Sequence, residues 1–338
     1  MKQLRKLLFP FSALYYGTVW LRNFLFDTGF WKSQEYDSPI ISIGNLNTGG
    51  TGKTPMTEFL IRLLKDRYSL SVLSRGYGRS TKGYRVVGAN DDASDVGDEP
   101  LQYRTKFKNI TVAVSEDRRT GIGNLLQGEA TTEIIILDDA YQHRKVKPSF
   151  SVLLTSYSDL FYKDYVLPVG NLRESRRGAK RAQVTIVTKC PKSISAQERT
   201  RIRSKLLRYT NGKVYFTSIA YSNTIYNTNE NRQLSSLTGT QVTVVTGIAN
   251  PKPLLEFLES NTISYSHQKY RDHHNFTSSE ISTLEKCSFI LTTEKDYMRL
   301  KSRIKHNAIF YLPIKVVFVD EKESQAFEKD VLAYAEIN

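Results

Sequence analysis

The stretch that decides the fold is Gly44-Asn45-Leu46-Asn47-Thr48-Gly49-Gly50-Thr51-Gly52-Lys53-Thr54-Pro55. Its last part matches the end of the phosphate-loop pattern G-x-x-x-x-G-K-[ST], in which backbone N–H groups surround the phosphate oxygens of a nucleotide. Asn47 stands where the pattern has its first glycine, and asparagine is among the few residues that tolerate a left-handed backbone. An apolar stretch precedes the loop, and Pro55 suits the first turn of a helix after it. We therefore expect a strand, a phosphate loop and a helix, with ATP bound by residues 47–54.

Two further features predict a magnesium site beside this loop. Lys53 is expected to reach the β- and γ-phosphates, and the hydroxyl of Thr54 is expected to bind Mg²⁺. The mostly apolar stretch 133–137 ends in Asp138 and Asp139, and an acid at the end of such a strand commonly holds the Mg²⁺ shell. The spacing does not decide which of the two aspartates contacts the metal.

The chain around the loop alternates short apolar runs with helix-like stretches, which predicts a P-loop NTPase-like, doubly wound α/β sheet. Near-continuous Val- and Ile-rich runs are typical of parallel strands buried on both faces. The expected strands are residues 40–43, 70–74, 110–114, 133–137, 150–154 and 184–188. Polar clusters follow several of them, at residues 75–78, 116–118, 138–139 and 189. Because ligands bind beyond the carboxyl ends of parallel strands, we expect these clusters to meet in one crevice.

The pattern changes after about residue 192, where polar stretches separate new strand candidates at 242–246, 289–293 and 309–312. We expect three parts: an N-terminal helix in residues 1–33, a P-loop domain in 34–212, and a smaller C-terminal α/β domain in 213–338. Only two cysteines occur, far apart, so neither a disulfide framework nor a cysteine-rich metal site is expected, and a reducing cytoplasm is indicated. The net charge of +14 favours an anionic partner: nucleic acid, anionic lipid or a phosphorylated substrate.

The N-terminal segment combines basic residues with an aromatic-rich apolar stretch at 7–26. Pro10 and Arg22 interrupt this stretch, which disfavours a span of about 20 apolar residues. Apolar residues nevertheless recur at helical spacing, and Trp20 is a residue type that favours a membrane–water boundary. Basic residues before such a stripe suit anionic head groups. Two interpretations remain open: a helix that lies on or dips into the membrane, and a helix that covers the core of the main domain.

A phosphate loop alone does not name the reaction. A small-molecule or lipid kinase, a switch or partitioning ATPase of the GGxGKT type, and a nucleic-acid-dependent ATPase are all compatible with it. Asp98 begins a predicted helix and could accept a proton from an acceptor hydroxyl, although acids favour the first turn of any helix. His273, in the cluster Asp272-His273-His274, could relay a proton, although adjacent histidines are commonly surface or packing residues.

Six motifs, in their order along the chain, resemble the tetraacyldisaccharide 4'-kinase (lipid A 4'-kinase) family from the N-terminal helix to about residue 298. They are the phosphate loop, Ser74-Arg75-Gly76-Tyr77-Gly78-Arg79, Gly97-Asp98-Glu99-Pro100, Leu137-Asp138-Asp139-Ala140-Tyr141-Gln142-His143-Arg144, Leu167-Pro168-Val169-Gly170-Asn171-Leu172-Arg173-Glu174 and Asp272-His273-His274. Ala140 stands where many members have glycine, which matters only if the turn needs a positive φ.

The resemblance implies transfer of the ATP γ-phosphate to the 4'-hydroxyl of a tetraacyldisaccharide 1-phosphate, giving lipid IVA. It implies Asp98 as catalytic base paired with His273, beside Lys53. Sugar and 1-phosphate contacts are implied for Tyr77, Arg118, Gln142 and Arg173, and metal-shell or nucleotide-site roles for Glu174, Asp138 and Asp139. A C-terminal domain that closes over the nucleotide is also implied. The partners would be the lipid A disaccharide precursor and the anionic surface at the cytoplasmic face of the bacterial inner membrane, with no nucleic acid and no obligate protein partner. A GGxGKT-type ATPase acting on a protein partner remains the alternative.

Overall fold

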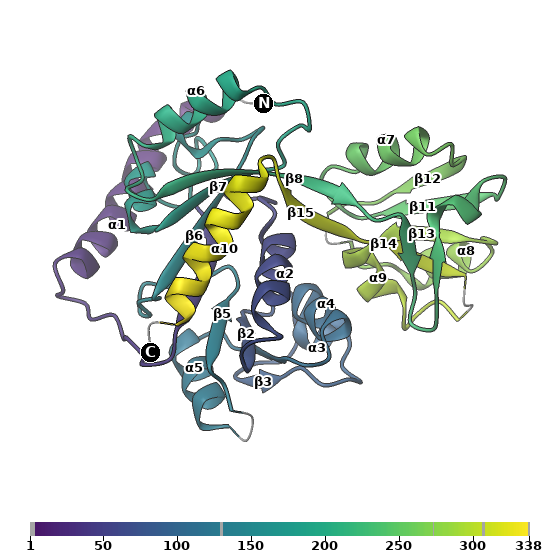
Figure 1. The fold of residues 1–338 in the computed structure, drawn as a ribbon, viewed down its shortest axis with the longest axis horizontal. Coiled ribbons are helices and arrows are strands. Elements are labelled where there is room, and N and C mark those ends of the chain that lie inside the picture. Colours follow the sequence, from purple (N-terminus) through teal and green to yellow (C-terminus); the bar gives the residue numbers. More distant parts are fainter. Residues whose placement is uncertain (1–3, 129–130, 273, 306–307, 337–338) are drawn as a thin grey trace.

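The computed structural model describes residues 4–128, 131–272, 274–305 and 308–336. In these residues the chain forms two sheets, of nine and six strands, which lie at opposite ends of the view in Figure 1. The nine-stranded sheet has the order β15-β8-β7-β6-β1-β5-β2-β4-β3. Its strands are β1 (Ile40–Asn45), β2 (Leu70–Ser74), β3 (Arg85–Val86), β4 (Thr111–Val114), β5 (Ile134–Leu137), β6 (Phe150–Ser156), β7 (Val184–Thr188), β8 (Lys213–Tyr221) and β15 (Ile314–Phe318).

The seven strands from β8 to β4 are parallel, and the edge strands β15 and β3 pair antiparallel. Every residue of β1, β2, β5, β6 and β7 is buried, as expected for strands covered on both faces. All six strands predicted between residues 40 and 188 are present, and their starts agree with the prediction to within one residue. The doubly wound α/β prediction is thus confirmed. β1 lies between β5 and β6, so the chain turns in opposite directions on either side of the phosphate loop, where such folds bind ligands.

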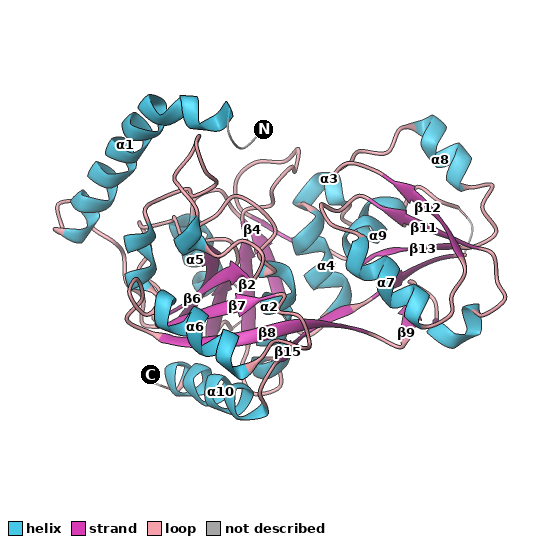
Figure 2. Ribbon diagram, turned by 90° about the horizontal axis from the view of Figure 1, so that it is seen from above, coloured by secondary structure: helices cyan, strands magenta, loops and turns pink. Residues whose placement is uncertain are grey.

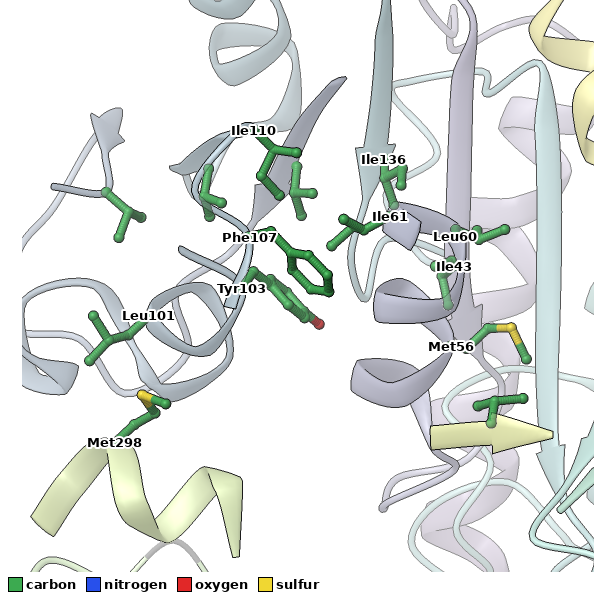
Figure 3. Packing of buried hydrophobic residues seen from close by; sticks show 14 of the residues in the cluster. Ile43, Met56, Leu60, Ile61, Leu101, Tyr103, Phe107, Ile110, Ile136 and Met298 are labelled. Atoms are coloured by element: carbon green, nitrogen blue, oxygen red, sulfur yellow. The ribbon is translucent and has the colours of Figure 1, made fainter. Parts of the chain in front are cut away.

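Helices cover both faces of this large sheet. They are α2 (Lys53–Leu64), α3 (Ala93–Val96), α4 (Asp98–Lys106), α5 (Arg118–Gln127), α6 (Ala196–Leu206) and α10 (Glu321–Ala335). The largest apolar cluster joins Ile43 of β1 and Ile136 of β5 to Met56 of α2 and Tyr103 of α4, and it continues to Met298 in the second half of the chain (Figure 3). This shared core is what fixes the position of α4, and therefore of its first residue, relative to the phosphate loop.

The smaller sheet has the order β10-β9-β14-β13-β11-β12. It consists of β9 (Thr224–Tyr226), β10 (Asn231–Gln233), β11 (Val242–Thr246), β12 (Tyr265–Lys269), β13 (Ile290–Thr293) and β14 (Ile309–Leu312), with α7 (Lys252–Ser260), α8 (Ser278–Leu284) and α9 (Glu294–Leu300). The expected division at residue 213 does not match the sheets. β8 and β15 belong to the large sheet and form an antiparallel pair at its edge, and α10 packs on the large sheet. The smaller sheet with α7, α8 and α9, which lies between β8 and β15 in the sequence, is called the second part of the chain below. Apolar periodicity predicts a strand but does not reveal which sheet the strand joins.

The N-terminal helix α1 (Phe9–Asp27) lies at the periphery, on the side away from the smaller sheet (Figure 2). Only Ser12 of its residues is buried. Its exposed large side chains include Phe11 (64% exposed), Leu14 (73%) and Leu21 (51%), three members of one helical stripe. Within the described residues, no helix combines the length and the apolar character needed to cross a membrane.

Candidate active site

The phosphate loop turns at two glycines rather than at the asparagine. Gly49 (φ 135°) and Gly52 (φ 85°) have a positive φ, whereas the φ of Asn47 is not positive. Asn47 is buried, and its side-chain amide donates to the carboxylates of Asp159 (3.3 Å) and Asp164 (3.5 Å). Asn47 therefore does not use the left-handed backbone that asparagine tolerates. This residue anchors the start of the loop, while Gly52 leads directly into α2, whose N-terminus favours an anion.

Neighbouring segments hold the loop backbone. The backbone N–H of Thr48 donates to the carbonyl of Asn171 (2.7 Å). At the end of β7, the hydroxyl of Thr188 donates to the carbonyl of Thr51 (2.7 Å), and the ammonium group of Lys189, the next residue, donates to the carbonyl of Gly50 (2.5 Å). The carbonyls of Gly50 and Thr51 are thus held from outside the loop, and the loop N–H groups other than those of Thr48 and Thr51 can face a phosphate.

Three charged side chains meet at the first turn of α2. The Nζ of Lys53 lies 3.6 Å from Oδ1 of Asp139, and Nη1 of Arg173 lies 3.4 Å from the same oxygen. All three side chains remain partly exposed, at 17%, 33% and 31%. Asp139 has a left-handed backbone (φ 47°), a conformation that is strained for a non-glycine residue and often marks functional sites. Two cations that share one carboxylate leave positive charge for a phosphate group.

Asp138 is buried directly behind this cluster. Its carboxylate accepts long hydrogen bonds from Thr57 and Ser74, both at 3.4 Å. Burial, helped by the charges of Glu99 and Asp139, raises the pKa of Asp138 to about 6. A buried carboxylate with only two hydroxyl donors at long range is poorly compensated, and a divalent cation would relieve this. The carboxylate oxygens of Asp138 therefore suit Mg²⁺ as ligands. The hydroxyl of Thr54, at the start of α2, is the further oxygen ligand predicted from the sequence.

Arg118 supports the backbone on either side of the site. It is only 1% exposed, and it donates to the carbonyls of Ser115 (2.5 Å) and Asp138 (3.1 Å). Burial lowers the pKa of this guanidinium to about 10. Arg118 thus supports the segment that carries both aspartates through its two outer nitrogens, and the role in substrate binding expected for it stays a prediction.

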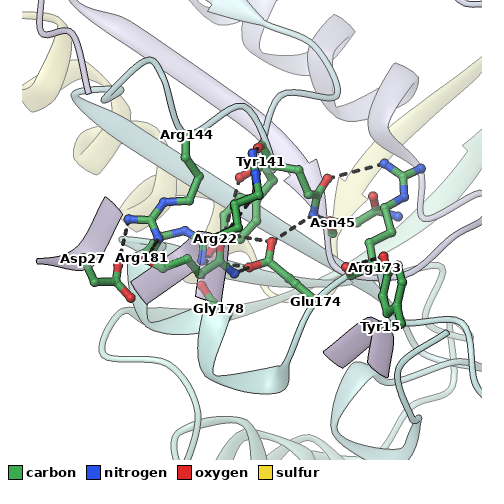
Figure 4. A network of polar contacts seen from close by, with 12 residues as sticks. Tyr15, Arg22, Asp27, Asn45, Tyr141, Arg144, Arg173, Glu174, Gly178 and Arg181 are labelled. Atoms are coloured by element: carbon green, nitrogen blue, oxygen red, sulfur yellow. Dashed lines mark hydrogen bonds and ion pairs between the residues drawn. The ribbon is translucent and has the colours of Figure 1, made fainter. Parts of the chain in front are cut away.

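Glu174 belongs to a polar network that ties α1 to the site (Figure 4). Its carboxylate accepts two hydrogen bonds from Arg181 (both 2.9 Å), one from Gln142 (3.1 Å) and one from Asn23 of α1 (3.1 Å). The expected metal role of Glu174 is therefore not retained, because a bidentate arginine and two amides occupy both oxygens. Gln142 links this network to Arg173, which lies 3.4 Å from its side-chain oxygen.

The N-terminal segment, which comprises α1 and the short 3-10 helix Leu4–Leu8 before it, is attached to residues 168–173 at several points. Arg5 donates to the carbonyls of Pro168 (2.9 Å) and Gly170 (2.6 Å), and the hydroxyl of Tyr15 donates to the carbonyl of Arg173 (2.8 Å). Arg5 therefore serves this internal contact. Since Asn171 also accepts from the phosphate loop, one segment links α1 to the nucleotide site.

Asp98 begins α4 and faces the second part of the chain. It is buried, and the guanidinium of Arg299 in α9 donates to both of its carboxylate oxygens, with Nε at 2.9 Å from Oδ1. His273, expected as its partner, lies outside the described residues. The neighbouring His274 contacts Glu280 (2.9 Å). Each oxygen of a carboxylate has two lone pairs, so the two hydrogen bonds from Arg299 do not by themselves use the whole acceptor capacity of Asp98.

Sequence reasoning missed that the second part of the chain engages α4 by charge. Besides Arg299, α9 contributes Lys295, which pairs with Glu99 (3.0 Å), and Glu294, which pairs with Lys106. Lys106 also pairs with the buried Glu58 of α2 (2.6 Å). The sequence Thr293-Glu294-Lys295-Asp296, whose alternating charges could have suggested such a contact, thus holds the two parts together.

A cavity of about 850 Å³ adjoins the segment after Asp139. Its lining combines aromatic and basic side chains from α1, from the residues after β4 and from those after β5. They are Arg22, Phe26, Phe30, Trp31, Lys32, Glu116, Asp117, Arg118, Arg119, His143, Arg144, Lys145 and Val146. Burial, reinforced by Arg118 and Arg75, lowers the pKa of His143 to about 4 and keeps it neutral at pH 7. Tyr77 is 72% exposed in the loop after β2, so it is accessible to a ligand.

Comparison with known proteins agrees with this geometry. The profile of the family Tetraacyldisaccharide-1-P 4'-kinase matches residues 4–334. A tetraacyldisaccharide 4'-kinase from Flavobacterium psychrophilum is 45% identical, over 99% of this chain and 98% of the relative. One from Bacteroides thetaiotaomicron is 41% identical, over 99% and 94%. A crystal structure of the "apo" form of LpxK from Aquifex aeolicus in complex with ATP superposes with a TM-score of 0.80 at 29% identity, covering 98% of this chain and 99% of that chain. The chain belongs to the tetraacyldisaccharide-1-phosphate 4'-kinase (LpxK) family.

Proposed function

We propose that this protein transfers the γ-phosphoryl group of ATP to the 4'-hydroxyl of a tetraacylated glucosamine disaccharide 1-phosphate, giving lipid IVA. One observation carries the proposal beyond family membership. The cations at the first turn of α2 and the basic, aromatic-lined cavity beside α1 flank the same segment, which contains Asp138 and Asp139. A phosphate donor and an amphipathic acceptor can therefore approach one point from two sides.

The donor half holds ATP through backbone and charge. The N–H groups of the loop other than those of Thr48 and Thr51, which donate to backbone carbonyls, surround the phosphates, and Lys53 neutralises charge that develops on the transferred group. Mg²⁺, held by Thr54 with Asp138 or Asp139, would supply further neutralisation when bound. Arg173, which already lies 3.4 Å from Asp139, would hold a phosphate oxygen of the donor or the acceptor.

The acceptor half supplies a base. Asp98 accepts the proton of the 4'-hydroxyl while the acceptor oxygen forms its bond to the γ-phosphorus and the bond to the β-phosphate oxygen of ADP breaks. Arg299 orients the carboxylate through two hydrogen bonds. Tyr77, exposed in the loop after β2, and Gln142, which contacts Arg173, would contact the sugar hydroxyls. His273 and closure of the second part of the chain remain expectations from the resemblance.

We further propose that α1 lies on an anionic membrane at the cytoplasmic face of the inner membrane, where the lipid acceptor resides. Its large exposed apolar side chains, among them Leu14 and Trp20, would otherwise contact water over the length of the helix. The Leu14→Glu variant should lose co-sedimentation with vesicles that contain anionic lipid, whereas Leu207→Glu, at an exposed leucine outside α1, should not. Equal binding by Leu14→Glu and the unchanged protein would contradict this placement.

The reaction is tested with γ-labelled ATP and a tetraacyldisaccharide 1-phosphate in detergent micelles. We expect labelled lipid from the unchanged protein. Asp98→Asn should lower kcat at least about a hundredfold, while affinity for ATP changes little, because the base acts in the transition state. Rapid ATP hydrolysis without labelled lipid would instead support a GGxGKT-type ATPase. A parallel loss of ATP affinity in Asp98→Asn would place Asp98 in the metal shell.

A further inference from the structure

Lys189 has an unusual position directly after β7. Its backbone is left-handed (φ 56°), which costs about 1 kcal/mol or more for a residue with a side chain. Such strain persists where the surrounding structure holds the residue in place. Here the ammonium group donates to the carbonyl of Gly50 (2.5 Å), and the preceding Thr188 donates to the next carbonyl of the loop, that of Thr51 (2.7 Å). The end of β7 thus holds two successive peptide groups of the phosphate loop.

The sheet order indicates which part of a nucleotide lies near this lysine. β5, which carries Asp138 and Asp139, adjoins β1 on one side, and β6 followed by β7 adjoins it on the other. The acceptor cavity is lined by residues after β4 and β5, so the γ-phosphate must point toward that side. The nucleoside then leaves the loop toward β6 and β7, where Lys189 is the strand-end residue.

The environment of Lys189 suits a ligand that has both charged and apolar groups. The residue is exposed as a whole, yet its ammonium end is desolvated against the loop, which lowers the pKa of Lys189. Lys53 lowers this pKa further, and Asp272 from the second part of the chain opposes the effect. The lysine therefore has its charge fixed at the loop, while the residue as a whole remains exposed to a ligand bound beside the loop.

We propose that Lys189 is a nucleotide-binding residue with two separable actions. Its ammonium group braces the phosphate loop at Gly50, and its hydrocarbon stem forms a wall against which the adenine ring packs. Packing of a flat ring on a methylene stem excludes water without a directed hydrogen bond. This proposal rests on the proposed function only in taking an adenine nucleotide as the donor, and it does not depend on the identity of the acceptor.

Two variants and two ligands separate the actions. Lys189→Met keeps an unbranched stem and removes the charge, and Lys189→Ala removes both. MgADP carries a base, whereas magnesium tripolyphosphate occupies the phosphate loop without one. Dissociation constants are measured by titration calorimetry on the full chain, and thermal melting verifies folding. Lys192→Ala, an exposed lysine three residues further on, is the matched control and should bind both ligands as the unchanged protein does.

We expect Lys189→Met to weaken both ligands by a similar factor of about three to ten, since a brace on the loop affects any phosphate. Lys189→Ala should weaken MgADP about tenfold more than Lys189→Met does, but not tripolyphosphate, because only ADP contacts the stem. Equal loss of both ligands in Lys189→Ala and Lys189→Met would overturn the adenine contact. MgADP affinity within twofold of the unchanged protein in both variants would overturn the whole proposal. Failure of the unchanged protein to bind MgADP would overturn the proposed function as well.

Discussion

The phosphate loop and the contact between α4 and α9 both depend on charged side chains, but they use them in opposite ways. At the loop, Lys53 is 3.6 Å from Asp139 and both side chains remain partly exposed. At the α4–α9 contact, Arg299 engages both oxygens of Asp98, and the two side chains are 9% and 10% exposed. Loose pairing keeps charge available for a ligand, whereas tight buried pairing uses the charge to hold two parts of the chain together.

This difference gives each charge a distinct expected cost of removal. A loosely paired cation contributes little to the folded state, so its loss should appear in the reaction. A tightly paired cation leaves an uncompensated buried partner when removed, so its loss should appear in stability first. Asp98 belongs to both regions, because it begins α4, takes part in the contact and is the proposed base.

Removal of Lys53 should have the largest effect. Lys53→Ala removes the side chain that faces the transferred phosphate, and we expect kcat to fall about a thousandfold with little change in the free energy of unfolding. Phosphoryl transfer to the lipid acceptor and urea unfolding measure the two quantities. Lys65→Ala, at the other end of α2 and paired with Asp66 at 2.6 Å, is the control. A loss of kcat below tenfold would show that Lys53 is not a phosphate ligand.

Removal of Arg299 should have an intermediate effect, and this effect should appear in the free energy of unfolding. Arg299→Gln leaves the carboxylate of Asp98 buried with fewer donors, so we expect the free energy of unfolding to fall by about 3 kcal/mol. Lys295→Gln breaks a pair of the same contact whose side chains are each 22% exposed, and it should cost less than about 1 kcal/mol. Chemical denaturation of both variants measures these two losses in the free energy of unfolding. Equal costs would remove the distinction between the buried and the half-exposed pair.

The contrast between these regions also explains what the sequence could predict. Strands such as β2 and β7 were predicted with correct bounds because residues buried on both faces form continuous apolar runs. The convergence of polar residues at strand ends followed from the parallel topology. Arg118 and Glu174 could not be assigned in this way, because a residue type does not reveal its partners. The partner of Glu174 in α1, Asn23, lies 151 residues away in the chain.

The contact between the two parts of the chain was even harder to predict from the sequence. A strand-forming pattern does not reveal that β8 and β15 pair with each other, nor that α9 packs on α4. Lys106 and Glu294, which form an ion pair, are 188 residues apart. The phosphate loop is local in sequence, and the strand before it and the helix after it were predicted from that local pattern. The contact is distant in sequence, and only the folded chain shows it.

Glu294 offers the smallest and most specific test of the contact. Burial, together with the charge of Glu58, raises the pKa of Glu294 to about 7 against the pull of Lys106, whereas the ordinary value is about 4.5. Between these pKa values the folded state binds more protons than the unfolded state, so this residue makes stability fall as the pH rises through that window.

Glu294→Gln cannot ionise at this position and should lose this contribution to the slope, so that its stability relative to the unchanged protein improves by about 1 to 3 kcal/mol from pH 5 to pH 8. Urea unfolding at the two pH values measures the change. Glu256→Gln, at a surface pair with Lys252, should leave the slope unaltered. If the stability of Glu294→Gln relative to the unchanged protein were the same at both pH values, Lys106 would keep Glu294 ionised throughout this range, and the charges of the contact would differ from those of the phosphate loop in burial alone.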